Sequence, residues 1–383
     1  MDFDLQWLLL GLPVAFAFGW LASRFDVRQW KREQRDSPKA YYQGLNLLLN
    51  EQHDKAIDAF IEAVQQDPDT SDLHFALGNL FRRRGEYERA VRVHEHLLQR
   101  ADLSAAERDR AQHALAQDFM KAGLFDRAEQ AFKALDGTAF DTEARLALLA
   151  LYERSREWRN AAEVAARLER SGSGSFASRI ANHWCELALE ADARQQTAEA
   201  DEALQRAREV APQSPRPLIL AGQRARARGD HRAALQEWGT LLAAHPAAFN
   251  LVALDYADSA KALGEPAAAL ERLEALYRRT PTSDLLTALG RLDADASRQR
   301  QRVLAHLQHQ GALSAAQTLL ALSAGSTLAD DESKALRDSV ARAARPLQRY
   351  RCAACAFEAQ NYFWQCPGCL GWDTYPPQRQ EDL

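Results

Sequence analysis

The sequence predicts an all-α protein built from helical hairpins, with an apolar N-terminal segment and a small four-cysteine module at its C-terminus. Three observations support this prediction. The 383-residue chain has only 13 prolines and 18 glycines, so long helices are rarely interrupted. Small and aromatic residues recur every 34 residues through the middle of the chain. Four of the five cysteines lie between Cys352 and Cys369.

The composition excludes several classes of protein. Hydrophobic residues make up 46% of the chain and charged residues 26%, which is typical of a globular protein. A formal net charge of −5 gives no basic face for nucleic acid, so no nucleic-acid partner is expected. Five cysteines, four of them in one cluster, are too few and too localised for a secreted protein held together by disulfides. We therefore expect a reducing compartment.

The N-terminal segment, residues 1–23, is predicted to be a transmembrane anchor. It contains the uncharged 18-residue run "LQWLLLGLPVAFAFGWLA", which as a helix spans about 27 Å, enough for the hydrocarbon core of a bilayer. A cleaved signal peptide would have basic residues before the run, but Asp2 and Asp4 stand there, and "GWLASRF" is a poor cleavage site. A buried soluble helix would be interrupted by polar residues.

The segment that follows the anchor, residues 24–36, predicts the orientation of the chain. Its basic residues are Arg24, Arg28, Lys31, Arg32 and Arg35. Because basic residues stay on the cytoplasmic side of a membrane helix, the bulk of the chain is expected to face the cytoplasm.

The middle of the chain repeats. Gly44 and Gly78 lie 34 residues apart, and so do Ala56 and Ala90. We align seven copies over residues 37–283, and proline often follows the second helix of a copy. This pattern resembles the tetratricopeptide repeat, in which small residues let two antiparallel helices approach closely and large residues fill the space between copies. Such an array, a solenoid, offers a surface to other proteins and has no catalytic pocket by default.

The repeat is irregular in two places. The stretch "SGSGS", residues 171–175, breaks the phase and predicts a flexible joint or a long loop. Residues 284–346 keep a helical pattern without the signature glycines and prolines, and we interpret them as degenerate repeats or capping helices. Ser104 and Glu107 have the spacing of a capping box at a helix start.

The C-terminal module, residues 347–378, is predicted to bind one metal ion. Its four candidate ligands form two C-x-x-C pairs: Cys352, Cys355, Cys366 and Cys369. Two such turns present four thiolates to one tetrahedral ion, and Pro367 and Gly368 suit the second turn. The alternatives are two disulfides or redox-active pairs, and the reducing compartment argues against the first. All four positions would be protein ligands, so the site is expected to be structural, with iron or zinc undetermined.

No catalytic residue and no organic-cofactor site is predicted. Cys185 lies among apolar residues and is expected to be a packed core thiol. His94 and His96 are two residues apart and face different ways on a helix. We find no phosphate-binding loop, no dinucleotide fingerprint and no nucleophile elbow. The chain is therefore not expected to be an enzyme.

The combination of anchor, repeats and terminal cysteine module resembles the lipopolysaccharide assembly protein B family. The likeness includes "LLLGLPVAFAFGW" at the anchor, "LGNLFRRRGEYERAVRVHEHLL" in the second repeat and "RYRCAACAFEAQNYFWQCPGC" at the end. The terminal module is rubredoxin-like, and the metal ligands of the family fall on Cys352, Cys355, Cys366 and Cys369. The first pair is C-A-A-C, without the proline and glycine of true rubredoxins, which weakens an electron-transfer reading and leaves the four ligands in place.

The resemblance implies a non-enzymatic, single-pass adaptor of the bacterial inner membrane. It implies that the adaptor promotes proteolysis of the UDP-3-O-acyl-N-acetylglucosamine deacetylase of lipid A synthesis by the membrane-anchored ATP-dependent zinc metalloprotease. It also implies that the adaptor acts together with other lipopolysaccharide assembly and export proteins. The alternatives are a rubredoxin-type electron-transfer protein and a generic tetratricopeptide co-chaperone. The sequence leaves open whether the chain forms a homo-oligomer.

Overall fold

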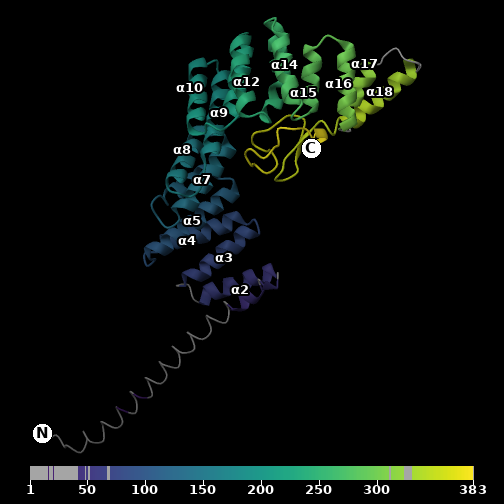
Figure 1. Ribbon diagram of the computed structural model, residues 1–383. Coiled ribbons are helices and arrows are strands. Elements are labelled where there is room, and N and C mark those ends of the chain that lie inside the picture. The colour runs from purple at the N-terminus through teal and green to yellow at the C-terminus, as the bar shows by residue number, and fades with distance from the viewer. Residues whose placement is uncertain are drawn as a thin grey trace, which may run out of the picture. The chain divides into compact units, whose positions relative to one another are not determined.

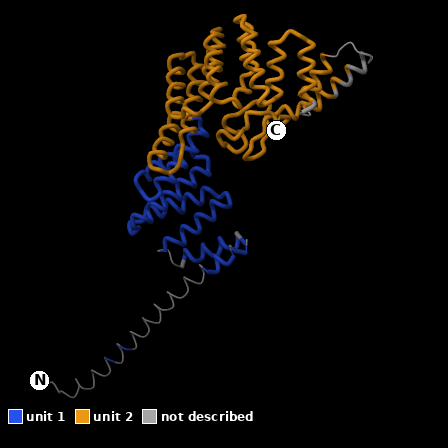
Figure 2. Tube along the Cα trace, viewed as in Figure 1, with its two compact units in different colours: residues 1–156 blue, residues 157–383 orange. Residues whose placement is uncertain are grey.

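The computed structural model divides into two compact units, residues 1–156 and residues 157–383 (Figure 1, Figure 2). The described residues are 16, 20, 42–47, 49–50, 52–66, 70–309, 312–322 and 330–382.

The predicted anchor, residues 1–23, and the basic segment, residues 24–36, lie outside the described residues except for Phe16 and Trp20, which are helical. Within the described part of the chain, we find no helix that combines the length and apolar character needed to cross a membrane.

The first unit consists of helical hairpins. After a helical stretch at residues 42–47, its helices are α2 (His53–Gln66), α3 (Ser71–Arg83), α4 (Tyr87–Gln99), α5 (Ala105–Ala122), α6 (Phe125–Lys133) and α7 (Asp141–Ser155). Each of these helices packs against the next one along the chain, as a tetratricopeptide array requires.

The second unit continues the pattern and ends in the cysteine module. Its helices are α8 (Trp158–Arg170), α9 (Ala177–Ala193), α10 (Thr197–Val210), α11 (Arg216–Ala227), α12 (His231–Ala244), η1 (Ala248–Val252), α13 (Ala253–Ala262), α14 (Pro266–Tyr277), α15 (Ser283–Leu292), α16 (Ala296–His309), α17 (Leu313–Leu322) and α18 (Asp330–Ala344). Proline follows the end of α10 by two residues, at Pro212, and the end of α12 by two residues, at Pro246.

The glycines of the repeat allow the close helix contact that the sequence predicts. A Cβ atom on Gly222 in α11 would lie 2.2 Å from Nε1 of Trp238 in α12. One on Gly78 in α3 would lie 2.5 Å from the ring of His94 in α4. Real Cβ atoms do not approach other atoms so closely, so only glycine fits at these positions. The prediction about the small residues of the first helix is confirmed.

The local predictions have different outcomes. The capping box is confirmed, because Ser104 accepts a hydrogen bond from the backbone N–H of Glu107, and the Glu107 carboxylate accepts one from the N–H of Ser104 at 3.1 Å. The stretch "SGSGS" forms a hydrogen-bonded loop between α8 and α9, in which the N–H of Ser173 donates to the carbonyl of Leu168. The boundary between the two units lies earlier, after Arg156.

The region predicted as degenerate repeats continues the helical stacking. Helix α15 packs against α13 and α14, α16 packs against α17, and α17 packs against α18. Leu285 and Leu289 of α15 are fully buried in the main apolar core of the second unit. The loss of signature residues therefore changes the sequence pattern without ending the array.

A buried polar cluster in the first unit was not predicted. Asp118 in α5 is fully buried, and its carboxylate lies 2.8 Å from Nη1 of Arg82 and 2.5 Å from Nδ1 of His94. A buried carboxylate is stable only when it is paired in this way. His94 thus fills a core position.

Candidate metal centre

The cysteine module folds around two short strands. Strand β1 (Tyr350–Arg351) pairs antiparallel with β2 (Glu358–Ala359), and a second antiparallel bridge joins Gln365 to Trp372. Each pairing closes a loop that contains one C-x-x-C pair. The two loops therefore form two hairpin-like turns, as the spacing of the cysteines predicts.

The four sulfur atoms gather at one point between these loops. The Sγ atoms of Cys352, Cys355, Cys366 and Cys369 all lie within 4.8 Å of one another. Sγ of Cys352 is 3.8 Å from that of Cys369, and Sγ of Cys355 is 3.6 Å from that of Cys366. A tetrahedron with metal–sulfur bonds of about 2.3 Å has edges of about 3.8 Å. The donor set thus fits one ion with four thiolate ligands.

The geometry is not that of two disulfides. All five cysteines are free, and the measured sulfur–sulfur distances are far above the roughly 2.04 Å of a disulfide bond. The fifth cysteine, Cys185, is fully buried in α9, and burial raises the pKa of its thiol to about 12. It is an inert core thiol, as expected.

The two C-x-x-C loops share one backbone pattern. The N–H of Ala356 donates to the carbonyl of Cys352 at 2.9 Å, and the N–H of Leu370 donates to that of Cys366 at 2.8 Å. Ala356 and Leu370 have left-handed backbones, with φ of 61° and 58°. Each residue directly after a loop therefore adopts the conformation that glycine accepts most easily.

Gly368 relieves a steric limit in the second loop. Its φ is not in the left-handed region, so the second loop does not use it for a special backbone angle. A Cβ atom there would lie 3.2 Å from Cβ of Phe357 and 3.4 Å from Sγ of Cys355. Glycine at this position leaves room for the sulfur cluster.

Backbone N–H groups favour thiolates at two of the sulfurs. Burial opposes ionisation of Cys352, but Oγ1 of Thr374, 3.3 Å from its sulfur, and backbone N–H groups outweigh it and lower the pKa of Cys352 to about 6. For Cys366, burial is likewise outweighed by the N–H groups of Cys369 and Gly368, which lower its pKa. Adjacent thiolates repel one another, and a bound cation removes that repulsion.

Aromatic residues pack behind the sulfur cluster. Tyr350 and Tyr375 are buried with Cys352 and Cys366 in one small core. Tyr362 lies edge-on to both rings, with centroids 5.5 Å from Tyr350 and 6.0 Å from Tyr375. A core this small supplies little stability by itself. A module of this size therefore depends on its ion and on its neighbours for stability.

The module is fastened to the helical array by the residues that follow its second loop. The carboxylate of Asp373 accepts hydrogen bonds from Oγ of Ser178 at 2.5 Å and from Nδ2 of Asn182 at 3.0 Å. The ring of Trp372 lies edge-on to that of His183, at 5.6 Å. Ser178, Asn182 and His183 all lie in the first half of α9.

A buried arginine completes this contact. Arg216, the first residue of α11, is only 3% exposed. Its guanidinium lies 5.3 Å from the ring of Trp364 and 5.9 Å from that of Trp372, and it pairs with Glu186 at 2.5 Å. A buried guanidinium is stabilised by nearby indole rings and by a carboxylate that pairs with it.

The C-terminal tail makes a second attachment at α15. Arg379 pairs with Asp284 at 3.0 Å, and the carboxylate of Asp382 accepts a hydrogen bond from the N–H of Ser283 at 2.9 Å. The module and tail therefore contact the beginnings of α9, α11 and α15, which lie far apart in the sequence.

The sequence predicts the four cysteines but not their attachment. Trp372 and Asp373 stand shortly after the second C-x-x-C pair. An acidic residue beside a tryptophan was the available signal for this attachment. No pattern in the sequence marks Arg216 or Asn182 as the residues that receive the module.

Comparison with known proteins agrees with this architecture. Residues 350–376 match the rubredoxin metal binding domain, and residues 41–105 match the tetratricopeptide repeat. The chain is 32% identical to lipopolysaccharide assembly protein B of Escherichia coli (strain K12), with 99% of each chain covered. It is 26% identical to the protein of the same name from Haemophilus influenzae, again over 99% of each.

A solved structure described as Naa15/Naa10 bound to HypK-THB is similar at 16% identity, covering 82% of this chain and 46% of that one, with a TM-score of 0.43. The match to the Escherichia coli protein covers nearly all of both chains and includes the repeats as well as the cysteine module. This chain belongs to the lipopolysaccharide assembly protein B family.

Proposed function

We propose that this chain is an adaptor in lipopolysaccharide assembly that brings a membrane-anchored ATP-dependent zinc metalloprotease to the deacetylase of lipid A synthesis. The observation that carries the proposal is the relationship to lipopolysaccharide assembly protein B, at 32% identity over 99% of both chains. In this role the chain coordinates lipid A synthesis with assembly and export by controlling how much deacetylase survives.

The architecture supports an adaptor that is not an enzyme. Stacked helical hairpins expose long surfaces suited to protein segments. The candidate metal centre uses four protein sulfurs, Cys352, Cys355, Cys366 and Cys369, which leaves no coordination position for substrate or water. A bound ion, iron or zinc, then has a structural role: it shapes the module that the array carries.

A membrane anchor at residues 1–23 fits this role. Tethering the array to the inner membrane, with its bulk in the cytoplasm, raises its effective concentration near a membrane-bound protease. In the proposed division of the chain, residues 24–36 stay at the membrane surface, residues 37–283 carry the repeats and residues 284–346 close the array. Residues 347–378 form the metal module.

Affinity capture from detergent-solubilised membranes tests the proposal. We expect the full chain to capture the protease and the deacetylase together, identified by mass spectrometry. A variant lacking residues 1–22 is expected to stay folded and to lose the protease, because the two no longer share a membrane. A variant with an unrelated transmembrane helix is the matched control and should regain it. Absence of both proteins from the full-chain capture would contradict the proposed function.

Electron transfer is a second candidate, favoured by one observation. Cys355 and Cys369 are exposed, so an iron ion at the centre would be close to solvent and accessible to a redox partner. This candidate predicts a purified protein that is red when oxidised, with a reversible one-electron couple. A colourless protein with zinc at the four cysteines contradicts it.

A further inference from the structure

A pocket of about 470 Å³ lies between α14, α15 and α16 in the second unit. Its walls are largely apolar and include Tyr277, Pro281, Leu289 and Ala305. None of these residues takes part in the contacts of the metal module with α9, α11 or the start of α15. The volume lies within the range of sites that bind ligands and exceeds the space that one side chain fills.

Two buried nitrogen atoms at this pocket have no hydrogen-bond partner among the described residues. His306 is 3% exposed, and its Nδ1 lies 2.7 Å from Oη of Tyr277, while its Nε2 is unpartnered. Nη1 of Arg302 is also buried and unpartnered. Leaving such groups without a partner is unfavourable, so they indicate that a polar group from outside belongs here.

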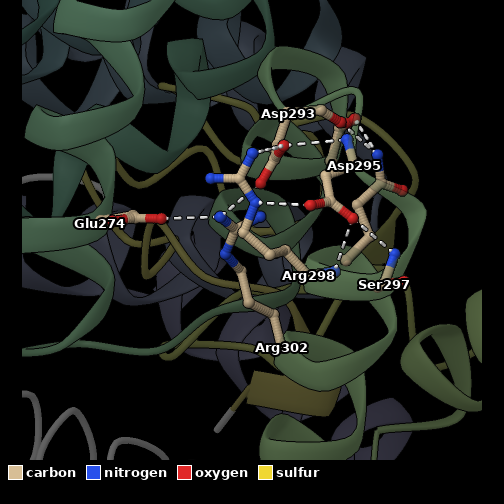
Figure 3. A network of polar contacts seen from close by, with 8 residues as sticks. Glu274, Asp293, Asp295, Ser297, Arg298 and Arg302 are labelled. Atoms are coloured by element: carbon tan, nitrogen blue, oxygen red, sulfur yellow. Dashed lines mark hydrogen bonds and ion pairs between the residues drawn. The ribbon is translucent and has the colours of Figure 1, made fainter.

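The other terminal nitrogen of the Arg302 guanidinium already has partners. Its Nη2 lies 2.7 Å from the carboxylate of Glu274 and 2.6 Å from that of Asp293 (Figure 3). Asp293 also pairs with Arg298, 3.3 Å away. Glu274 and Asp293 together hold Nη2 of the Arg302 guanidinium. The remaining face of Arg302 is therefore a preorganised donor.

The charge at the rim of the pocket favours an acidic ligand. Arg278 is exposed, and its Nε donates to the backbone carbonyl of Glu274 at 3.2 Å, but it makes no ion pair with any described residue. Glu274, the acid among the lining residues, is matched by Arg302. Burial and the charge of the Asp382 carboxylate raise the pKa of Tyr277, and this carboxylate already accepts hydrogen bonds from the backbone N–H and the hydroxyl of Ser283. A carboxylate would thus meet one guanidinium without an ion pair and one free N–H donor, which is the arrangement that arginine provides for carboxylates.

We propose that this pocket binds a segment of a partner protein in which an apolar side chain stands next to an aspartate or glutamate. The apolar side chain packs on Tyr277, Leu289 and Ala305, and the carboxylate accepts hydrogen bonds from Arg302 and Arg278. This inference rests on the proposed adaptor function, and it assigns that function a contact site separate from the metal module.

A peptide selection on the full chain in lipid nanodiscs tests the proposal. The probe is a phage-displayed library of random peptides of about twelve residues, long enough to cross a groove between helices. We expect enriched peptides to share a Phe, Leu or Trp beside an Asp or Glu. Synthetic fluorescein-labelled copies then give dissociation constants by fluorescence polarisation.

Substitutions at the rim have matched controls on the same helices. Ala305→Trp fills the pocket, whereas Leu304→Trp places the same ring at the neighbouring exposed position outside the lining. Arg278→Glu reverses the rim charge, and Arg279→Glu does so one residue away, outside the lining. We expect Ala305→Trp and Arg278→Glu each to weaken peptide binding about tenfold or more, with both controls within about twofold of the parent chain.

Three outcomes of the peptide experiment overturn the proposal: no enrichment, enriched peptides without the acidic and apolar pair, or equal binding to Ala305→Trp and Leu304→Trp. A co-purifying small molecule, seen by native mass spectrometry and lost in Ala305→Trp, also overturns it, because the pocket then serves a small ligand. The proposed function fails separately. If the chain captures neither protease nor deacetylase, the adaptor role is wrong whatever the peptides do. If capture persists without peptide binding, only the pocket assignment is wrong.

Discussion

Asp373 and Asn182 are separated by 191 residues, yet Nδ2 of Asn182 donates hydrogen bonds to both carboxylate oxygens of Asp373, at 3.0 and 3.1 Å. Asp373 follows the second cysteine loop, and Asn182 lies in α9. Asn182 also accepts a hydrogen bond from Arg216, at 3.0 Å, so α11 belongs to the same network. The geometry of the sulfur cluster is thereby linked to two helices of the array.

Removal of the Asp373 carboxylate tests this link. Asp373 has a φ of 54°, so Asp373→Gly removes the acceptor without backbone strain. We expect a loss of about 1–3 kcal/mol in the free energy of unfolding, because Ser178 and Asn182 lose their partner. Hydrogen exchange should rise in residues 350–376 and in the first turns of α9. Asp373→Asn keeps one acceptor oxygen and should lose less; equal stability of the two variants contradicts the link.

The contact between Gly222 and Trp238 predicts a sharp difference between two glycines. Gly222→Ala should cost about 1–3 kcal/mol, because its methyl group overlaps the Trp238 ring and the helices must separate. Gly239, next to that tryptophan in α12, is in open space, because a Cβ atom there would meet no other atom within 4 Å. Gly239→Ala should therefore stabilise the protein by about 0.5–1 kcal/mol. Chemical denaturation measures both, and equal effects would show that the close approach is unimportant.

The left-handed residues of the cysteine loops predict stabilising substitutions. Ala356→Gly and Leu370→Gly should each make the module more stable by about 1 kcal/mol, because an L-residue is strained at these φ values. The matched control is Ala354→Gly, since Ala354 lies in the first loop without a left-handed φ. It should be neutral or destabilising. The rate at which a chelator removes the metal measures the stability of the module in each variant. Faster loss of metal from Ala356→Gly than from Ala354→Gly contradicts the prediction.

Acid should weaken the first unit through His113. Burial lowers the pKa of His113 below 6.5, partly opposed by Glu143, whose carboxylate lies 4.0 Å away, while Arg82 lowers it further. The unfolded chain then binds more protons than the folded one, so the stabilisation is fully present above pH 6.5 and is lost as the pH falls from 6.5 through the lower pKa of the folded state.

His113→Phe keeps the stacking on Phe140, whose ring lies 4.7 Å away, and removes the titration. Lowering the pH from 7.5 to 5.5 should lower the melting temperature of the parent chain more than that of this variant. A difference that is independent of pH rules out this contribution.

Much of the fold could be predicted because the repeat is a local signal. Gly44, Gly78 and Gly222 mark positions where two neighbouring helices touch, and contacts between helices that are close in sequence are typical of a repeat array. The four cysteines could be predicted for a similar reason, since their spacing alone fixes the two turns. Ser104 and Glu107 form a capping box that specifies the start of α5 within four residues.

The remaining features depend on contacts between distant residues. Arg216 has no local pattern that marks it as the partner of Trp364 and Trp372, because nothing near it in the sequence requires an aromatic neighbour. The pocket at His306 arises where α14, α15 and α16 meet, and it exists only once all three are packed. Single-sequence patterns do not encode such meeting points.

In the proposed function, a metal-shaped module held on a membrane-tethered array lets this chain direct the deacetylase to the protease. The most direct test is the half-life of the deacetylase in cells whose only copy of this protein carries Cys352→Ser and Cys355→Ser. We expect the deacetylase to persist as long as in cells without the protein, while a Cys185→Ser copy restores rapid turnover. If the double serine variant is shown to lack metal and the deacetylase still turns over at its normal rate, the metal module is not needed for this role.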